Sequence, residues 1–349
     1  MLFRRRFLGQ DCGKATDLVF SFFNSGKNGL AEAPAAGFLE IFYMITDKRL
    51  CLSGLVLRAT DGFLLATTLL LTLLALFFHS RVEGWPVLVL MNAAAALLYV
   101  CVVFAGWKVR SRVAKFLLRT SAVEGYFIYL FLVVHKLQLI IVRSWQDPAV
   151  LGLERSVFGV QPNVWLQKFT TPVLTEWLMF AYVIYNLIYP VLAALIYFKR
   201  GEDKLEDYFF TLAVVNVICC LGFILFPVAS PMHWIRGQFT VPLKGFFFTS
   251  VGEFVRGHLH PVGGSIPSPH AAVGSIMALM AFKYERPLSH ALAPVILSLY
   301  VATFYGRYHY ITDTIAGILA AVLAAALAPV LVKGWNALVT RRSSDPHHN

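Results

Sequence analysis

The sequence has few charged residues: Asp, Glu, Lys and Arg make up only 14% of its 349 residues, against roughly 25% in soluble proteins. A water-soluble domain of this size needs more charge on its surface, so a soluble enzyme is excluded. Apolar residues make up 58%, which excludes a disordered chain. The five cysteines are an odd number, and most lie in apolar runs, so neither a disulfide framework nor a zinc site is indicated. Long apolar runs instead predict a membrane protein with several spans.

Eight apolar segments approach the roughly 20 residues that a helix needs to cross a bilayer. They lie at about 61–79, 86–106, 121–142, 177–198, 208–228, 270–284, 288–305 and 312–333. Because an isolated lipid-facing strand leaves its backbone groups unsatisfied, each must be a helix, and the predicted fold class is an all-α integral membrane protein. The third segment contains His135 and Lys136, which we interpret as a buried or snorkelling pair, with a proton path as the alternative.

The positive charges indicate how these helices are oriented. The excess of 30 Lys and Arg over 19 Asp and Glu would suggest a nucleic-acid partner in a soluble protein. Here most basic residues fall in residues 1–60 and in alternate short loops such as 107–120 and 199–207. Cytoplasmic loops collect Lys and Arg, so we expect both termini in the cytoplasm and no nucleic-acid partner. The long loops at about 143–176 and 229–269 then lie outside, on the interface or folded over a cavity.

A dense polar segment precedes the sixth predicted helix, where residues 263–270 have the sequence GGSIPSPH. Ser265 or Ser268 can cap this helix, whose free N–H groups and dipole favour an anion. His270, in the first turn, would lie beside such an anion. The alternative is a capped loop whose histidine is simply polar at a water interface.

A second polar segment, residues 305–313 (YGRYHYITD), precedes the eighth predicted helix. His309 and Asp313 are four residues apart and share a helical face. The carboxylate can therefore hold one ring nitrogen and leave the other as a nucleophile or base. The alternative is a His–Asp pair that only tightens the bundle. The predicted topology puts both polar segments on the outer face, which favours one shared site.

Residues 265–270 (SIPSPH) and 309–313 (HYITD) resemble the last two motifs of the type-2 phosphatidic acid phosphatase superfamily. The His-Tyr-x-x-Asp form and residues 226–231 (FPVASP) are most similar to its inositol phosphorylceramide synthase branch. Residues 166–172 (LQKFTTP) look similar too. The resemblance covers about residues 165–333.

This resemblance implies a domain organisation. Residues 121–333 would form a six-helix catalytic bundle, preceded by two extra helices and a basic loop in residues 61–120. Residues 1–60 would be a cytoplasmic or interfacial segment, with a short interfacial helix near residues 38–43. Residues 334–349 would be a polar tail.

The resemblance also implies a phosphohistidine mechanism. His309 would attack a lipid phosphate ester, Asp313 would orient it, and His270 would protonate the leaving group. An acceptor hydroxyl or water would then take the phosphoryl-linked group, since this chemistry rests on positioning and positive charge. No metal or other cofactor is expected. Phosphate contacts would come from Ser265, Ser268, His233, Arg236 and Arg307.

The chain departs from the common phosphatases of the superfamily at several positions. They have Gly before the second-motif histidine, where Pro269 removes a backbone donor. They have Arg six residues before the third-motif histidine, where this chain has Thr303. The first-motif Lys and Arg are not recoverable, and His233 and Arg236 are the substitutes we expect; Arg307 lies on a different helical face from the missing Arg. These losses favour the lipid phosphotransferase branch.

Three functions remain open on the sequence alone. The preferred one is a membrane phosphotransferase that moves a phosphoryl-linked headgroup, for example phosphoinositol, between lipids. The second is a lipid phosphate phosphatase with water as acceptor, and the third is a proton-coupled transporter, although no inverted repeat supports transport. The partners would be bilayer lipids, and the site would face the periplasm of a bacterium or the lumen of a eukaryotic Golgi or endomembrane.

His258 and His260 could join His270 at a metal, but their spacing matches no recognised ligand set, and we interpret them as solvated.

Overall fold

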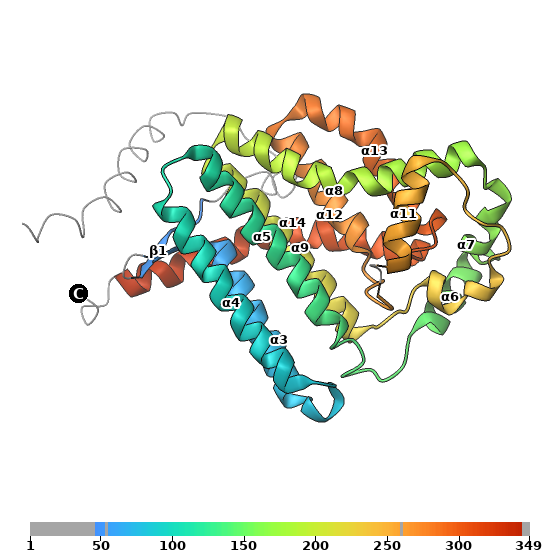
Figure 1. Cartoon of the computed structure of the whole chain (residues 1–349), viewed down its shortest axis with the longest axis horizontal. Helices are drawn as coiled ribbons and strands as arrows, with labels where there is room; N and C mark the ends of the chain where they lie inside the picture. Colours follow the sequence, from blue (N-terminus) through green and yellow to red (C-terminus); the bar gives the residue numbers. More distant parts are fainter. Residues whose placement is uncertain (1–45, 53–54, 259–260, 344–349) are drawn as a thin grey trace, which may run out of the picture. The chain divides into compact units, whose positions relative to one another are not determined.

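The computed structural model describes residues 46–52, 55–258 and 261–343, and most of this part is helical (Figure 1). In chain order the elements are β1 (Leu50–Leu52), β2 (Leu55–Leu57), α3 (Ala59–Phe77), η1 (His79–Arg81), α4 (Trp85–Lys108), α5 (Arg112–His135), α6 (Asp147–Phe158), α7 (Pro162–Trp165), η2 (Leu166–Phe169), α8 (Pro172–Arg200), α9 (Glu202–Leu225), α10 (Pro231–Trp234), η3 (Arg236–Gln238), α11 (Phe247–His258), α12 (Pro269–Tyr284), α13 (Arg286–Tyr305) and α14 (Ile311–Ser343). The interfacial helix expected near residues 38–43 lies outside the described residues.

Seven helices of the described part are long and apolar enough to cross a membrane: α3, α4, α5, α8, α9, α13 and α14. The sixth predicted span corresponds to α12, which is shorter, with 16 residues. Every predicted span overlaps one helix of the structure. The protein is therefore an all-α, multi-pass membrane protein, as predicted.

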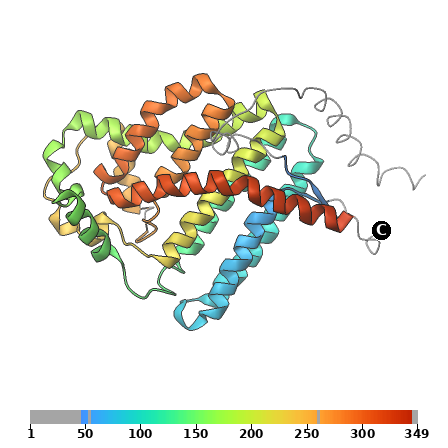
Figure 2. The same ribbon diagram turned by 180° about the vertical axis from the view of Figure 1, so that it is seen from behind.

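Helix α9 is the most deeply buried of these spans: 72% of its most apolar window lies inside the bundle. Its apolar residues surround the whole helix, as expected for a helix that is covered on every side. It contacts α3, α5, α8, α12 and α14, and α14 runs across it in the rear view (Figure 2). Helix α12 packs in turn against α8, α9, α13 and α14. The short helix that carries His270 is thus fixed by four longer ones.

Helix α4 has the opposite character. It packs against α3 and α5 and exposes large apolar side chains such as Val87, Leu90, Leu97 and Leu98. In a soluble protein such a surface would promote aggregation, whereas in a bilayer it is the lipid-facing surface.

The starts of two spans differ most from those predicted. Helix α5 covers Arg112–His135 rather than 121–142, and α9 begins at Glu202 rather than at 208. The predictions stopped at charged residues because a lone charge in a span is costly. In the structure Arg119 and Glu206 face each other, so the pair is neutralised inside the bundle.

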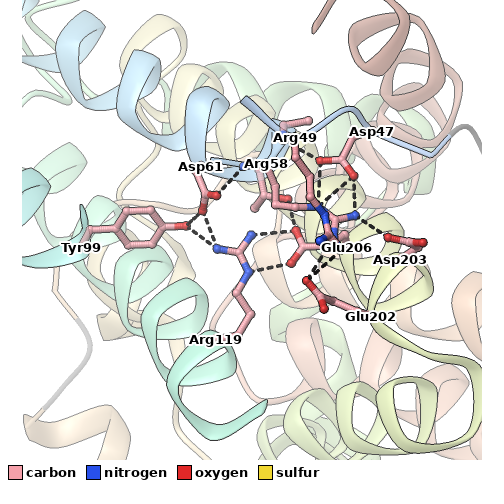
Figure 3. A network of polar contacts seen from close by, with 11 residues as sticks. Asp47, Arg49, Arg58, Asp61, Tyr99, Arg119, Glu202, Asp203 and Glu206 are labelled. Atoms are coloured by element: carbon pink, nitrogen blue, oxygen red, sulfur yellow. Dashed lines mark hydrogen bonds and ion pairs between the residues drawn. The ribbon is translucent and has the colours of Figure 1, made fainter. Parts of the chain in front are cut away.

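Arg119 is the centre of a buried ion network (Figure 3). Its guanidinium donates to Asp61 Oδ1 at 2.5 Å and to Glu206 Oε1 at 2.6 Å. The Tyr99 hydroxyl donates to the same Asp61 oxygen at 2.6 Å. Arg58, at the start of α3, forms ion pairs with three further carboxylates, those of Asp47, Glu202 and Asp203. The network joins α3, α4, α5 and α9 and so fixes α3 and α4 to the rest of the bundle.

Helix α14 continues through residues 334–343, which the sequence assigned to a polar tail. Trp335 donates its indole N–H to the carbonyl of Lys48 at 2.7 Å, and the Asn336 side chain donates to the carbonyl of Thr46 and accepts from the Lys48 N–H. These bonds hold the segment before β1 against the last turns of α14.

The two long loops expected outside the membrane contain α6, α7, α10 and α11. Glu176, near the start of α8, accepts hydrogen bonds from the N–H groups of Phe246, Phe248 and Thr249. This carboxylate satisfies donors at the start of α11, which the helix itself leaves unpaired. Helix α11 is thereby held against α8, beside the helix ends that carry the two histidine segments.

Candidate active site

The two histidines singled out in the sequence face each other. His270 lies in the first turn of α12, and its Nδ1 is 3.3 Å from Nε2 of His309, just before α14. His309 is 1% exposed. The two residues are 39 positions apart, and the contact forms because α12 and α14 begin at the same end of the bundle. If the two nitrogens share one proton, one of them donates it and the other accepts it through its lone pair.

The other nitrogen of His309 is held by the protein. Nδ1 lies 2.9 Å from the carbonyl oxygen of Ser265 and 3.6 Å from Oδ2 of Asp313. Asp313 Oδ2 also accepts from the Ser265 hydroxyl at 2.5 Å and from the Tyr310 N–H at 2.9 Å. With Nδ1 donating to a carbonyl, the tautomer that leaves a lone pair on Nε2 is favoured. Nε2 is thus the nitrogen available for attack.

His270 is oriented by aromatic rings. Its imidazole stacks on Tyr182 of α8, with ring centroids 4.6 Å apart and planes at 23°. Tyr182 stacks in turn on Tyr308, at 4.2 Å and 7°, and Tyr185 lies 5.0 Å from the His270 ring. Stacking of this kind fixes the plane of the imidazole relative to His309.

The loop before Ser265 is held by the end of α5. Gly263 and Gly264 both have positive φ, at 96° and 65°, a backbone conformation that glycine adopts without strain. The Gln138 side chain accepts from the Gly264 N–H at 2.6 Å. A Cβ at Gly264 would lie 2.7 Å from Nε2 of His135. His135 is therefore packed against this loop, whereas Lys136, directly after the last residue of α5, is exposed.

Helix α6 contributes two buried carboxylates. Asp147 accepts from the N–H groups of Ala229 and Ser230, at 2.7 and 3.2 Å, and from the Tyr310 hydroxyl at 2.9 Å. Seven residues later, Glu154 accepts from the Thr312 N–H at 2.9 Å, at the start of α14. Burial raises the pKa of both carboxyl groups. Helix α6 thus fixes the residues that follow His309 and the turn at Ala229 and Ser230.

Asn163 of α7 holds the chain on the other side of His309. Its side-chain NH₂ donates to the carbonyls of Phe304 and His309, at 2.8 and 2.9 Å. Thr303, which stands where the superfamily's common phosphatases have Arg, is fully buried and bonds to the Thr314 hydroxyl at 2.7 Å. Where the common phosphatases have Arg, this chain therefore has a buried contact between α13 and α14.

The five residues predicted to contact phosphate lie in different places. Ser265 and Ser268 are both buried; Ser265 bonds Asp313, and Ser268 caps α12 at the Ala271 N–H. Arg307 has φ 70°, donates to the carbonyl of Val241 and lies 4.4 Å from the Phe239 ring centroid.

The remaining two lie in the outer loop. Arg236 begins η3 and is exposed. His233 is half-buried in α10, and burial together with the charge of Arg236 lowers its pKa. A neutral imidazole supplies a hydrogen bond rather than positive charge at this position.

Four residues that hold the site were not found from the sequence: Gln138, Asp147, Glu154 and Asn163. Each bonds backbone groups of a distant segment, and no local spacing marks such a contact. The only available signal was the presence of Asp147 and Glu154 in a loop that is otherwise poor in acidic residues.

The geometry of the site does not by itself identify a protein family, whereas the comparison of the sequence with family models does. The model described as the PAP2 superfamily matches residues 148–327, just over half of the chain. The chain belongs to the type-2 phosphatidic acid phosphatase (PAP2) superfamily. None of the curated proteins and none of the solved structures compared matches the chain. The matched region starts within α6, earlier than the resemblance expected, and so includes Glu154.

Membership of the PAP2 superfamily makes the chain a phosphatase or a phosphotransferase of lipid phosphate chemistry. Among the described residues, no group of three or more His, Cys, Asp or Glu side chains is arranged to hold a metal ion. The side chains of His258 and His260, considered above as a metal pair, lie outside the described residues.

Proposed function

We propose that this PAP2-superfamily protein is a lipid phosphotransferase that works through a phosphohistidine on His309. The observation that supports it is the 3.3 Å contact between His270 Nδ1 and His309 Nε2, with Nδ1 of His309 held by the Ser265 carbonyl. This arrangement leaves one lone pair for attack and places a proton carrier beside it.

In the first step His309 Nε2 forms a bond to phosphorus of the donor lipid while the bond from phosphorus to the leaving oxygen breaks. His270 gives its proton to that oxygen as the general acid. The proton stays on Nδ1 of His309, which donates it in a hydrogen bond to the Ser265 carbonyl, and this bond stabilises the phosphorylated ring. In the second step His270 takes the proton of an acceptor hydroxyl, whose oxygen attacks phosphorus and releases His309.

The acceptor distinguishes two functions that share this chemistry. We favour a lipid hydroxyl, as in the inositol phosphorylceramide synthase branch, because residues 226–231 and the His-Tyr-x-x-Asp form are most similar to it. Thr303 in place of Arg also departs from the common phosphatases. Water as acceptor would make the same residues a lipid phosphate phosphatase.

We further propose that both termini are cytoplasmic and that the histidine pair faces the periplasm or lumen. Both α12 and α14 start at the histidine pair. The basic residues Lys108 and Arg112, by contrast, lie at ends of α4 and α5, and Arg200 ends α8. This separation supports a site on the membrane face opposite the basic loops.

The test is incubation of purified protein with headgroup-labelled phosphatidylinositol and either ceramide or diacylglycerol. Label in a new lipid is the expected result, whereas release of water-soluble labelled phosphoinositol instead supports hydrolysis with water as acceptor. His309→Ala is expected to abolish either product. Wild-type activity in that variant, with every lipid that the wild type uses, would contradict the proposal.

A further inference from the structure

The hydroxyl of Ser230 is buried but forms no hydrogen bond with the described part of the protein. Ser230 is 1% exposed, and its Oγ has no hydrogen-bond partner among the described residues. It precedes Pro231 at the start of α10, where a serine commonly caps a helix, yet its side chain makes no capping bond. A buried hydroxyl without a partner costs about 1–3 kcal/mol, so its retention calls for an explanation.

The backbone of Ser230 is held in an unusual conformation. Its φ is 93°, in the left-handed region that residues other than glycine rarely adopt and that is found preferentially at functional sites. Asp147 stabilises this turn by accepting from the N–H groups of Ala229 and Ser230.

The segment around Ser230 bonds to both catalytic segments. The carbonyl of Ala229 accepts from the Gly263 N–H at 3.3 Å, two residues before Ser265. The Met232 N–H donates to the carbonyl of Arg307 at 3.1 Å, two residues before His309. Asp147 adds a third link, through the Tyr310 hydroxyl. These bonds join the segment that contains Ser230 to the segments that precede Ser265 and His309.

We propose that the Ser230 hydroxyl donates a hydrogen bond to a non-bridging oxygen of the phosphoryl group. This inference deepens the proposed function and rests on it, because it assigns a phosphate-binding residue to the same site. A neutral donor that is already desolvated can stabilise an oxyanion without reorganisation.

The decisive variant is Ser230→Gly, because glycine removes the hydroxyl and relieves the positive φ. It is expected to keep or raise the unfolding temperature. Ser156→Ala is the matched control, since Ser156 is exposed on α6 and donates only to the carbonyl of Leu153. Inorganic phosphate and orthovanadate serve as probes, measured by thermal stabilisation of the full-length protein in detergent and, where lipid turnover is present, by competitive inhibition.

We expect Ser230→Gly to weaken phosphate and vanadate binding about tenfold or more, the usual effect of losing a hydrogen bond to a charged group. Ser156→Ala is expected to bind both probes as the wild type does. Phosphate affinity in Ser230→Gly within about twofold of the wild type, or wild-type protein that neither probe stabilises, would overturn the inference. A drop in unfolding temperature with unchanged affinity would instead identify a hydroxyl that binds only a structural water.

The probes separate this inference from the proposed function, because they bind without any lipid. Tenfold weaker phosphate binding in a protein that releases phosphate rather than transferring a headgroup would support Ser230 as a ligand and contradict the phosphotransferase. Headgroup transfer together with unchanged phosphate affinity in Ser230→Gly would support the phosphotransferase and contradict Ser230 as a phosphate ligand.

Discussion

Ser265 connects Asp313 to His309. The Ser265 carbonyl lies 2.9 Å from Nδ1 of His309, and the Ser265 hydroxyl lies 2.5 Å from Oδ2 of Asp313, whereas that carboxylate oxygen is 3.6 Å from the ring nitrogen. The aspartate therefore orients the histidine chiefly by fixing the serine and the backbone of Tyr310. The hydroxyl lies on the Nδ1 side of the ring, away from the nitrogen that faces His270.

This arrangement predicts that Ser265→Ala reduces the rate of turnover more than phosphate binding. The variant keeps the carbonyl but removes the bond that fixes it to Asp313, and we expect kcat to fall about tenfold, the effect of about 1.4 kcal/mol. Inhibition by inorganic phosphate should be unchanged. Weaker phosphate inhibition with unchanged kcat would instead give Ser265 the phosphate-binding role expected from the sequence.

Asp147→Asn is predicted to impair activity although the residue lies outside the sequence motifs. The carboxylate accepts three hydrogen bonds, two of them from N–H groups of adjacent residues. An amide must turn its NH₂ toward one of these donors, which loses at least one bond. We expect a decrease in kcat of about 10- to 100-fold, measured beside Glu83→Gln, an exposed carboxylate in the loop before α4. Equal rates in the two variants would show that Asp147 does not position the site.

Arg119→Met is predicted to destabilise the protein strongly. Removing this guanidinium leaves the buried carboxylates of Asp61 and Glu206 without their shared partner, and breaking a buried ion pair in this way costs about 3–5 kcal/mol. Arg110→Met, at an exposed position just before the same helix, should cost less than about 1 kcal/mol. Thermal unfolding in detergent measures both, and unfolding temperatures that agree would show that the network contributes no stability.

Acidification is predicted to destabilise the wild type through His233. Burial, and then the charge of Arg236, lower the pKa of this histidine from 6.5, so below pH 6.5 the unfolded chain binds a proton that the folded chain does not. The stability contributed by neutral His233 is therefore complete above pH 6.5 and is lost as pH falls toward the lowered pKa. Between about pH 7.5 and about pH 5 the unfolding temperature of the wild type should fall more steeply than that of His233→Gln. Parallel curves would contradict the assignment.

The sequence was sufficient for the helices and for the histidine pair. Long apolar runs predict spans because the bilayer fixes their length, and the loop charges placed residues 263–270 and 305–313 at the same face. The charged ends of α5 and α9 were mispredicted because the sequence of one segment shows that a buried charge would be costly. It does not show which residue of another segment would pair with that charge. Arg119 and Glu206 are 87 positions apart.

The residues that hold the catalytic segments escaped prediction for a related reason. Asp147 bonds Tyr310 across 163 positions, and Asn163 bonds the His309 carbonyl across 146. These are bonds from side chains to distant loops, which no helical period or motif spacing indicates. Thr303 illustrates the limit of motif comparison, since its position is buried between α13 and α14 and the missing Arg has no counterpart there.

The central claim is that His309 becomes phosphorylated, and trapping that intermediate tests it most directly. Protein quenched during turnover of a lipid labelled at phosphorus should carry an acid-labile, alkali-stable label. The account predicts that the label is absent in His309→Ala and persists in His270→Ala. A label that remains in His309→Ala, or full activity of that variant, would contradict the account.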